Sequence, residues 1–384
     1  MARLDCGHFV RGECRSCGWI ERDYAAQLAE KQRVCRELID PSQHFDWLPA
    51  QPSALAGFRN KAKLVVGGSV EAPTLGILDG DGRGVDLPHC ALYEPGIVAC
   101  LPTLRALVQR AGLTPYRVPE RRGELKYLLL SIDPPSGRLM LRVVLRSQEA
   151  LGRLRREQAW LRAELPGLQV LSVNLQPLHA AIVEGEEEIL LDGDSHLTLG
   201  INDVQLRLQP GGFWQTNTEV AAALYRQARD WCRELPLSRV LDLYCGIGGF
   251  AQHLVAPGRE IRGVEIHPAA VASAALGQAS APGPAPRFER ADADAVDASL
   301  LTGLDLLVVN PPRRGISGAL CEAIEQAAPA HLLYSSCNPQ SLARDLARLP
   351  SYLPRKARLF DMFPHTPHSE VLVFVEHRDH PGNS

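Results

Sequence analysis

The C-terminal half of the sequence repeats one pattern from Phe213 onwards. A short apolar run ends in a polar or glycine-containing turn, and a helical stretch follows, as in RVLDLYCGIGGF, IRGVEIH, DLLVVNPP and HLLYSSCNP. Strands that are apolar on both faces and alternate with helices are typical of a doubly wound parallel sheet. The pattern therefore predicts an α/β, Rossmann-like domain over residues 211–384.

The first of these turns, from Asp242 to Phe250, predicts a nucleotide site. Its glycines let the backbone approach a ligand closely. Glu265 ends the next strand, 19 residues after Gly246, where a carboxylate can accept both hydroxyls of a ribose. The acidic Asp242 suits a cationic amino group better than a phosphate. The turn therefore favours S-adenosylmethionine over NAD, and a plain tight turn of an α/β fold is the alternative.

The N-terminal half has a different pattern. Residues 57–208 are rich in short strands separated by Gly, Asp and Pro, with two helical stretches between them. This predicts an α+β unit with an antiparallel sheet. Before it, periodicity predicts a helix over residues 22–39 that buries one face, formed by Tyr24, Leu28, Val34 and Leu38. We expect two domains, 1–210 and 211–384.

Two further strand ends of the C-terminal half carry candidate catalytic groups. Arg313, in the turn NPPRRG, could hold a phosphate or an oxygen-rich base edge. Cys337 lies where a strand passes into a helix, and helix N–H groups lower a thiol pKa and favour the nucleophilic thiolate. Glu370, before the apolar run VLVFVE, is a candidate general base. The alternatives are a buried packing cysteine and a solvated surface carboxylate.

Four cysteines near the chain start form a candidate metal site. Three of them follow the spacing C-x7-C-x2-C and the fourth lies in the turn LPHCALY, which gives Cys6, Cys14, Cys17 and Cys90. Four thiolates can close a tetrahedral zinc site or hold an iron–sulfur cluster, and the spacing alone does not choose between them. Unpaired buried thiols are the alternative. We expect the remaining cysteines other than Cys337 to be structural: Cys35, Cys100, Cys232, Cys245 and Cys321.

Several stretches resemble the RNA uracil-5-methyltransferase family. One signature reads N-P-P-R-x-G, a gap of 16 residues and LLYSSCN, the second reads FDMFPHTPHSE, and FWQTN is similar to the family's F-x-Q-x-N segment. Ser341 stands where Thr is usual and Ser369 where a large apolar residue is usual, and neither change removes a chemical group. The resemblance implies Cys337 as nucleophile and Glu370 as general base. It implies four contacts to the methyl donor, at Gln215, Tyr244, Glu265 and Asn310.

The chemistry of uracil methylation agrees with these roles. C5 of uracil is a poor nucleophile, and a thiolate that adds to C6 turns the ring into an enolate whose C5 can attack the methyl sulfonium. A base must then remove the C5 proton so that the thiolate can leave. The target base must also be out of any stack to be reached.

The same motifs are similar to the iron–sulfur branch of the family. This resemblance implies a [4Fe-4S] cluster on Cys6, Cys14, Cys17 and Cys90. We expect a structural role, since methyl transfer moves no net electrons. Larger members carry an OB-like RNA-binding domain before the cluster. Because Cys6 comes almost at once here, we expect that domain to be absent and the substrate to be 23S ribosomal RNA.

The charge balance limits how this chain can bind RNA. Lys and Arg number 41 and Asp and Glu 44, and a net charge of −3 excludes a globally basic binder but not a local basic groove. We expect RNA contacts at local basic stretches, namely Arg59, Lys61, Lys63, Arg121, Arg122 and Lys126. No apolar run reaches the roughly 18 residues of a membrane span, and the start lacks a signal peptide's apolar stretch. We therefore expect a cytoplasmic monomer.

Two rival interpretations remain. A tRNA uracil-5-methyltransferase would share the catalytic motifs, but those enzymes lack the cysteine cluster. A zinc-bound RNA-binding module with an inactive transferase domain would explain the N-terminal cysteines, but it would not need an intact Cys337, Glu370 and glycine loop.

Overall fold

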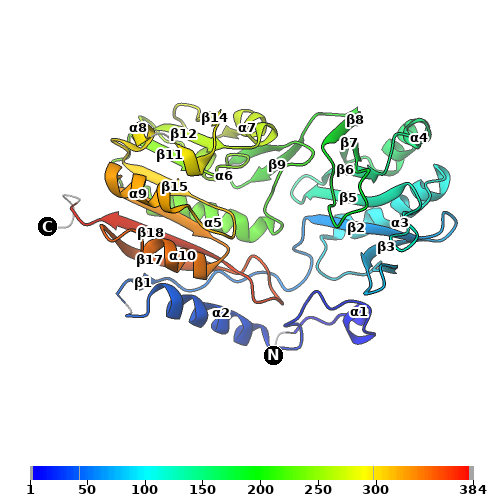
Figure 1. Cartoon of the computed structure of the whole chain (residues 1–384), viewed down its shortest axis with the longest axis horizontal. Coiled ribbons are helices and arrows are strands. Elements are labelled where there is room, and N and C mark those ends of the chain that lie inside the picture. Colours follow the sequence, from blue (N-terminus) through cyan, green and yellow to red (C-terminus); the bar gives the residue numbers. More distant parts are fainter. Residues whose placement is uncertain (1–2, 43, 297, 380–384) are drawn as a thin grey trace.

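The computed structural model describes residues 3–42, 44–296 and 298–379. Within these ranges the strands form an eight-stranded, a seven-stranded and a three-stranded sheet. Figure 1 shows the eight-stranded sheet with its helices at one end of an elongated molecule and the seven-stranded sheet at the other.

The eight-stranded sheet has the order β1-β17-β18-β16-β15-β11-β12-β14. Five neighbouring strands are parallel: β16 (His331–Ser336), β15 (Leu306–Val309), β11 (Arg239–Leu243), β12 (Glu260–Glu265) and β14 (Arg287–Arg290). β18 (Glu370–His377) runs antiparallel to both β16 and β17 (Tyr352–Phe360), and β1 (Asp46–Trp47) extends the far edge. The predicted α/β sheet is confirmed, while β17 was not anticipated.

Both faces of this sheet are covered, which explains its continuous apolar strands. One face packs against α5 (Thr218–Trp231) and α6 (Gly249–His253). The other packs against α2 (Tyr24–Ile39), α9 (Gly318–Ala327) and α10 (Pro339–Leu346). The shorter helices of this half are α7 (Pro268–Ala275), the 3-10 turn η1 (Ala293–Ala295) and α8 (Ala298–Leu301).

The seven-stranded sheet builds the central part of the chain. Its order is β4 (Gly84–Asp86), β3 (Pro73–Leu78), β2 (Lys61–Gly68), β5 (Leu125–Asp133), β6 (Arg138–Leu145), β7 (Leu168–Leu175) and β8 (Glu187–Gly193). α3 (Pro95–Arg110) and α4 (Leu151–Glu164) pack with it around one apolar core. The sheet is antiparallel as predicted except between β6 and β7, which are parallel because α4 forms a crossover between them.

The three-stranded sheet joins the two larger parts. It consists of β9 (Leu197–Ile201), β10 (Val204–Leu208) and β13 (Gln278–Ala279), all antiparallel. The buried side chains of β9 and β10 belong to the same apolar core as α5 and α6. The division at residue 210 stays a prediction, and these two strands pack with the C-terminal side of it.

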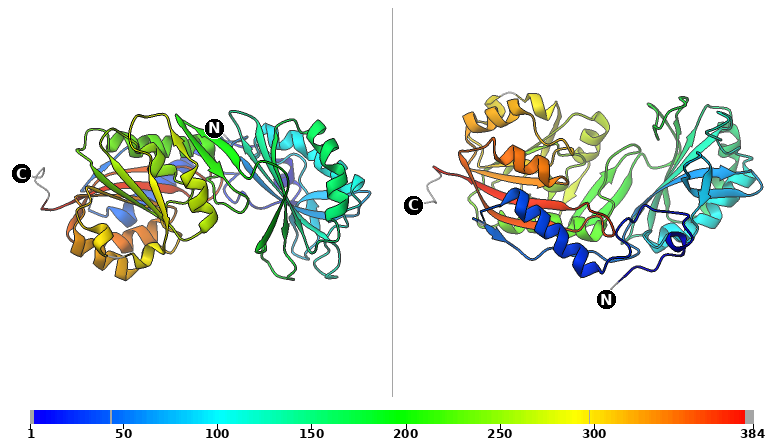
Figure 2. Two further views of the ribbon diagram at one scale, coloured as in Figure 1. Left: turned by 90° about the horizontal axis from the view of Figure 1, so that it is seen from above. Right: turned by 60° about the horizontal axis from the view of Figure 1, so that its bottom comes forward.

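The N-terminal segment contacts both parts of the molecule. A short helix, α1 (Gly7–Val10), lies near the seven-stranded sheet, whereas α2 lies beside α10, as both views of Figure 2 indicate. The predicted helix is therefore present, but its buried face is not the predicted one: Gln27, Lys31 and Cys35 are buried, and Leu38 is exposed. None of the helices in the described ranges combines the length and apolar character that a membrane crossing requires.

Candidate active site

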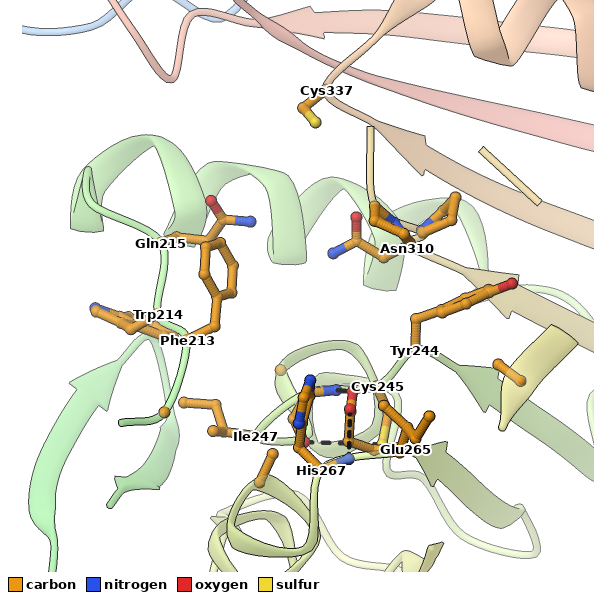
Figure 3. Close-up of a pocket in the computed structure, with 18 of the residues that line it drawn as sticks. Phe213, Trp214, Gln215, Tyr244, Cys245, Ile247, Glu265, His267, Asn310 and Cys337 are labelled. Atoms are coloured by element: carbon orange, nitrogen blue, oxygen red, sulfur yellow. Dashed lines mark hydrogen bonds between the residues drawn. The ribbon is translucent and has the colours of Figure 1, made fainter. Parts of the chain in front are cut away.

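A cavity of about 990 Å³ opens at the carboxyl ends of the parallel strands. This is the edge at which open α/β sheets bind their ligands. All six side chains with predicted catalytic or donor-binding roles line it: Gln215, Tyr244, Glu265, Asn310, Cys337 and Glu370. In Figure 3, Cys337 reaches into the cavity from one side, Gln215 and Asn310 lie in the middle, and Glu265 lies further along.

The glycine turn after β11 fixes the nucleotide end of this cavity. Gly246 and Gly248 have φ of 55° and 83°, a left-handed conformation that glycine adopts without strain. The Gly246 amide donates to one Glu265 oxygen (3.1 Å) and the His267 amide to the other (2.9 Å). The two amides therefore hold the Glu265 carboxylate at the cavity wall, and the oxygens retain lone pairs for ribose hydroxyls.

Asp242 does not occupy the predicted place. It is fully buried, and it is not among the described residues that line the cavity. One carboxylate oxygen accepts from the Ala251 amide (3.0 Å), and the other has no partner. Burial raises the pKa of Asp242 to about 8. A direct contact with the donor's amino group, expected from the sequence, is therefore not supported.

Three other donor-site residues are held by distant parts of the chain. The Gln215 carbonyl accepts from the side-chain amide of Asn60, just before β2 (2.9 Å). The Asn310 amide donates to Leu243 at the end of β11 (3.4 Å). Tyr244 has a left-handed φ of 58°, and its hydroxyl donates to Asp294 (2.6 Å), so this hydroxyl is already engaged.

Strand pairing brings the predicted nucleophile and base together. In the antiparallel ladder of β16 and β18, Ser336 pairs with Val371. The next position along the ladder therefore sets Cys337 opposite Glu370. The Glu370 carboxylate is close enough to raise the pKa of the Cys337 thiol. Two residues 33 positions apart in the sequence thus share one end of the cavity.

The direction of the Cys337 pKa differs from the prediction. Burial and the Glu370 carboxylate raise it, and this effect outweighs the contribution of Arg313, which lowers it. The helix start was expected to dominate. It does not, because Cys337 precedes the Asn338 cap of the eight-residue helix α10, while the thiol is half-buried beside an acidic group.

Glu370 has the environment of a general base that works near neutral pH. Burial raises its pKa to about 7, and the hydrogen bond donated by the Ser335 hydroxyl acts in the opposite direction. Ser335 was not predicted, although its position in the motif YSSCN beside Cys337 could have indicated it. A base with a pKa near the working pH transfers protons most efficiently.

The rival bases in the same stretch are less suitable. Asp361 is fully buried, and its carboxylate accepts from Lys31 (2.6 Å) and Tyr24 (2.8 Å). His368 accepts at Nδ1 from Arg313 (2.8 Å), and burial lowers its pKa. Arg313 therefore reaches both His368 and the Cys337 thiol, and it lines the cavity where a base edge would lie.

The four N-terminal cysteines are gathered in one place. Burial raises the pKa of Cys17 to about 12, and the thiols of Cys90, Cys14 and Cys6 act in the same direction. The four sulfurs therefore lie within electrostatic reach of one another. In the part of the chain that the structure describes, no three His, Cys, Asp or Glu side chains are close enough to hold a single ion. The five other cysteines predicted to be structural are all buried, as expected.

The predicted RNA contacts fall into two groups. Lys63, Arg121 and Arg122 are exposed and stay predictions, as do the half-buried Arg59 and Lys61. Lys126 is buried, and its ammonium group donates to the Gln176 side chain (2.5 Å) and the Leu178 carbonyl (2.6 Å). This position contradicts the expectation that Lys126 contacts RNA, because its donors are directed into the protein.

Comparison with known proteins places this geometry in a family. Residues 288–378 match the family profile described as tRNA (Uracil-5-)-methyltransferase. A solved structure, Pyrococcus abyssi tRNA (uracil-54, C5)-methyltransferase in complex with S-adenosyl-L-homocysteine, has the same fold. Its TM-score is 0.77 at 22% identity, over 97% of this chain and 85% of that one.

Full-length relatives are closer in sequence. The chain is 45% identical over 373 residues to the 23S rRNA (uracil(747)-C(5))-methyltransferase RlmC of Pectobacterium atrosepticum, over 97% of this chain and 100% of the relative. It is 47% identical to that of Edwardsiella ictaluri and 43% identical to that of Escherichia coli, over 97% of this chain and 99% of each relative. The chain therefore belongs to the RNA uracil-5-methyltransferase family.

Proposed function

We propose that this protein transfers a methyl group from S-adenosylmethionine to C5 of a uridine in 23S ribosomal RNA. The observation that carries the proposal is the ladder of β16 and β18, which sets Cys337 opposite Glu370 in a cavity that also contains Glu265. The substrate follows from the relatives named above, which match the chain over nearly its whole length.

In the proposed reaction, the Cys337 thiolate adds to C6 of the uracil, and the ring becomes an enolate. The methyl donor supplies an electrophilic carbon, which C5 attacks. Glu370 then removes the C5 proton, and the electron pair of that bond expels the Cys337 sulfur as a thiolate. Arg313, which contacts the thiol, lowers its pKa and so favours the attacking form.

We assign the donor contacts to Gln215, Tyr244, Glu265 and Asn310. Glu265 is suited to the ribose hydroxyls, because both its oxygens face the glycine turn and are already oriented by backbone amides. Asn310 and Gln215 lie between Glu265 and Cys337 (Figure 3), where the methyl group must meet the base. For Tyr244 we assign the ring rather than the hydroxyl, since Asp294 engages the hydroxyl.

We propose further that Cys6, Cys14, Cys17 and Cys90 hold a [4Fe-4S] cluster with a structural role. The donor set of four thiols fits such a cluster. Four ligands of one zinc ion lie about 3.8 Å apart, as follows from a Zn–S bond of about 2.3 Å. A cubane cluster spaces its ligands more widely, and wide spacing agrees with sulfurs that are gathered but not close enough for one ion.

The remaining expectations about cellular context belong to this proposal. A ribosomal RNA substrate implies a cytoplasmic enzyme. Binding to RNA would use the exposed cations Lys63, Arg121 and Arg122, which could position the phosphate backbone without specifying sequence. We expect the protein to act as a monomer, since one chain contributes every side chain of the cavity.

The test is methyl transfer with defined RNAs. Purified protein and labelled S-adenosylmethionine are incubated with 23S ribosomal RNA or with tRNA transcripts, both without prior modification, and the products are mapped by mass spectrometry. We expect one 5-methyluridine in 23S ribosomal RNA and none in tRNA. Methylation of tRNA alone would replace the proposed substrate, and methylation of neither RNA would refute the activity.

A further inference from the structure

We propose that α2 and the turn before it hold the loop 361–369 in place, and that Lys31 is the central positioning residue for the general base Glu370. This inference rests on the proposed function. The loop connects β17 to β18, and Glu370 is the first residue after it. Any displacement of the loop therefore changes where the base begins.

The buried face of α2 is polar, although it lies against the protein interior. Gln27, Lys31 and Cys35 follow one another at intervals of four residues and are each 1–2% exposed. A helix normally buries an apolar stripe. Amide and ammonium groups are buried only where they have partners, because burial without a partner is costly. In this face, the partners lie in or beside the loop 361–369.

Lys31 makes the strongest of these contacts. Its ammonium group donates to the Asp361 carboxylate (2.6 Å) and to the Phe363 carbonyl (3.0 Å), and both charged side chains are fully buried. The second Asp361 oxygen accepts from the Tyr24 hydroxyl (2.8 Å), which itself accepts from the Ser53 amide (2.7 Å). The first residue of the loop is therefore fixed by two side chains of one helix.

The middle and the end of the loop are held in the same way. The His365 amide donates to the Gln27 side chain (2.9 Å), and the His365 carbonyl accepts from the Trp19 amide (2.9 Å). His365 has a left-handed φ of 65°, a conformation that a non-glycine residue keeps only when its surroundings impose it. Cys35 lies 3.9 Å from the Ser369 hydroxyl, directly before Glu370.

These contacts join opposite ends of the chain, with partners more than 300 residues apart. The loop borders the cavity through Phe363 and His368, both of which line it. Misplacement of a catalytic group by about 1 Å can cost roughly a hundredfold in rate. The N-terminal helix is therefore placed to set the distance between Glu370 and the C5 proton without touching the substrate.

The experiment compares Lys31→Met with a matched change on the same helix. Arg33→Met also removes a cation, but its partners Glu30 and Glu37 lie on the exposed side of α2. For Lys31→Met we expect kcat to fall roughly ten- to a hundredfold, while KM for the methyl donor stays within about twofold. A methylated RNA should accumulate as a covalent adduct, because proton removal is the delayed step. Arg33→Met should behave like the unchanged protein.

A second variant separates positioning from loss of folding. Lys31→Met with Asp361→Leu removes both buried charges, a change that proteins often tolerate. It should melt near the temperature of the unchanged protein and still accumulate the adduct. A reduced amount of folded enzyme would lower the rate without any adduct. Normal kcat in this double variant would overturn the proposal, whereas an inactive unchanged protein would instead refute the proposed function.

Hydrogen exchange on the unchanged protein provides a test that needs no variant. The His365 amide, which donates to Gln27, should exchange as slowly as the interior amides of α2. Exchange at the rate of an open loop would show that α2 does not hold this segment, and would overturn the proposal.

Discussion

At the scale of single residues, the sequence identified the groups but not their electrostatics. Cys337 and Glu370 each lie in a recognisable motif, and both line the cavity. The direction of the Cys337 pKa was wrong, because it depends on how deeply β16 and β18 bury the pair and on their register. Asp242 failed for a similar reason: its distance from the cavity depends on the packing of α6 and not on its neighbours in sequence.

The two catalytic residues should fail in different ways. Cys337→Ala should give neither methylation nor an RNA adduct, because the covalent bond cannot form. Glu370→Gln keeps the shape but removes the base, so attack and methyl transfer proceed and elimination stalls. Methylated RNA should remain bound through denaturing electrophoresis, with turnover reduced roughly a hundred- to ten-thousandfold. Glu376→Gln on the same strand is the control, and normal turnover of Glu370→Gln would assign the base elsewhere.

The pH dependence of turnover should report Glu370. The base acts only when deprotonated, so kcat should fall as the pH decreases through about 7, the pKa to which burial raises Glu370. The hydrogen bond from Ser335 lowers this pKa. Its removal in Ser335→Ala should therefore raise the pKa and move the acidic limb of the profile to higher pH. A limb that stays in place in single-turnover measurements would contradict the assignment.

At the scale of elements, periodicity located most helices and strands but not their partners. The helix at 22–39 was predicted correctly, yet the apolar residues chosen for its buried face include the exposed Leu38. Its true inner face is chosen by Asp361 and His365, far along the chain, and no local pattern encodes that pairing. The strand β17 was missed because Pro354 and several charged residues interrupt its apolar pattern.

The turn after β11 and the end of β12 give a prediction about the methyl donor. Glu265→Ala removes a carboxylate that both orients the turn and faces the ribose. Hydrogen bonds to charged groups contribute about 1.5–3 kcal/mol each, so donor affinity should fall at least about tenfold. Glu289→Ala on the neighbouring strand β14, which is exposed, is the control. Unchanged affinity of Glu265→Ala in calorimetry would show that the carboxylate does not hold the ribose.

At the scale of the whole molecule, the sequence indicated two parts but not how the N-terminal segment connects them. Cys90 lies between β4 and α3 of the seven-stranded part, whereas Cys6, Cys14 and Cys17 precede α2. The Ile20 amide donates to the Cys17 carbonyl, and the Trp19 amide donates to His365 in the loop before Glu370. A cluster on these cysteines would therefore tie the central sheet to the segment that contacts the catalytic loop.

This arrangement leads to a prediction about removal of the metal. Protein purified without oxygen should be brown and contain iron and sulfide near four each per chain, if four thiolates hold one cubane. Cys90→Ser should lose the cluster, and because metal binding contributes to folding, hydrogen exchange should accelerate in residues 3–22 and then in α2. Cys100→Ala, a buried cysteine of α3 outside the set, should keep the cluster and the protection. Stoichiometric zinc without iron would contradict the cluster. Full protection of α2 in Cys90→Ser would show that the cysteine site and the catalytic loop are held independently.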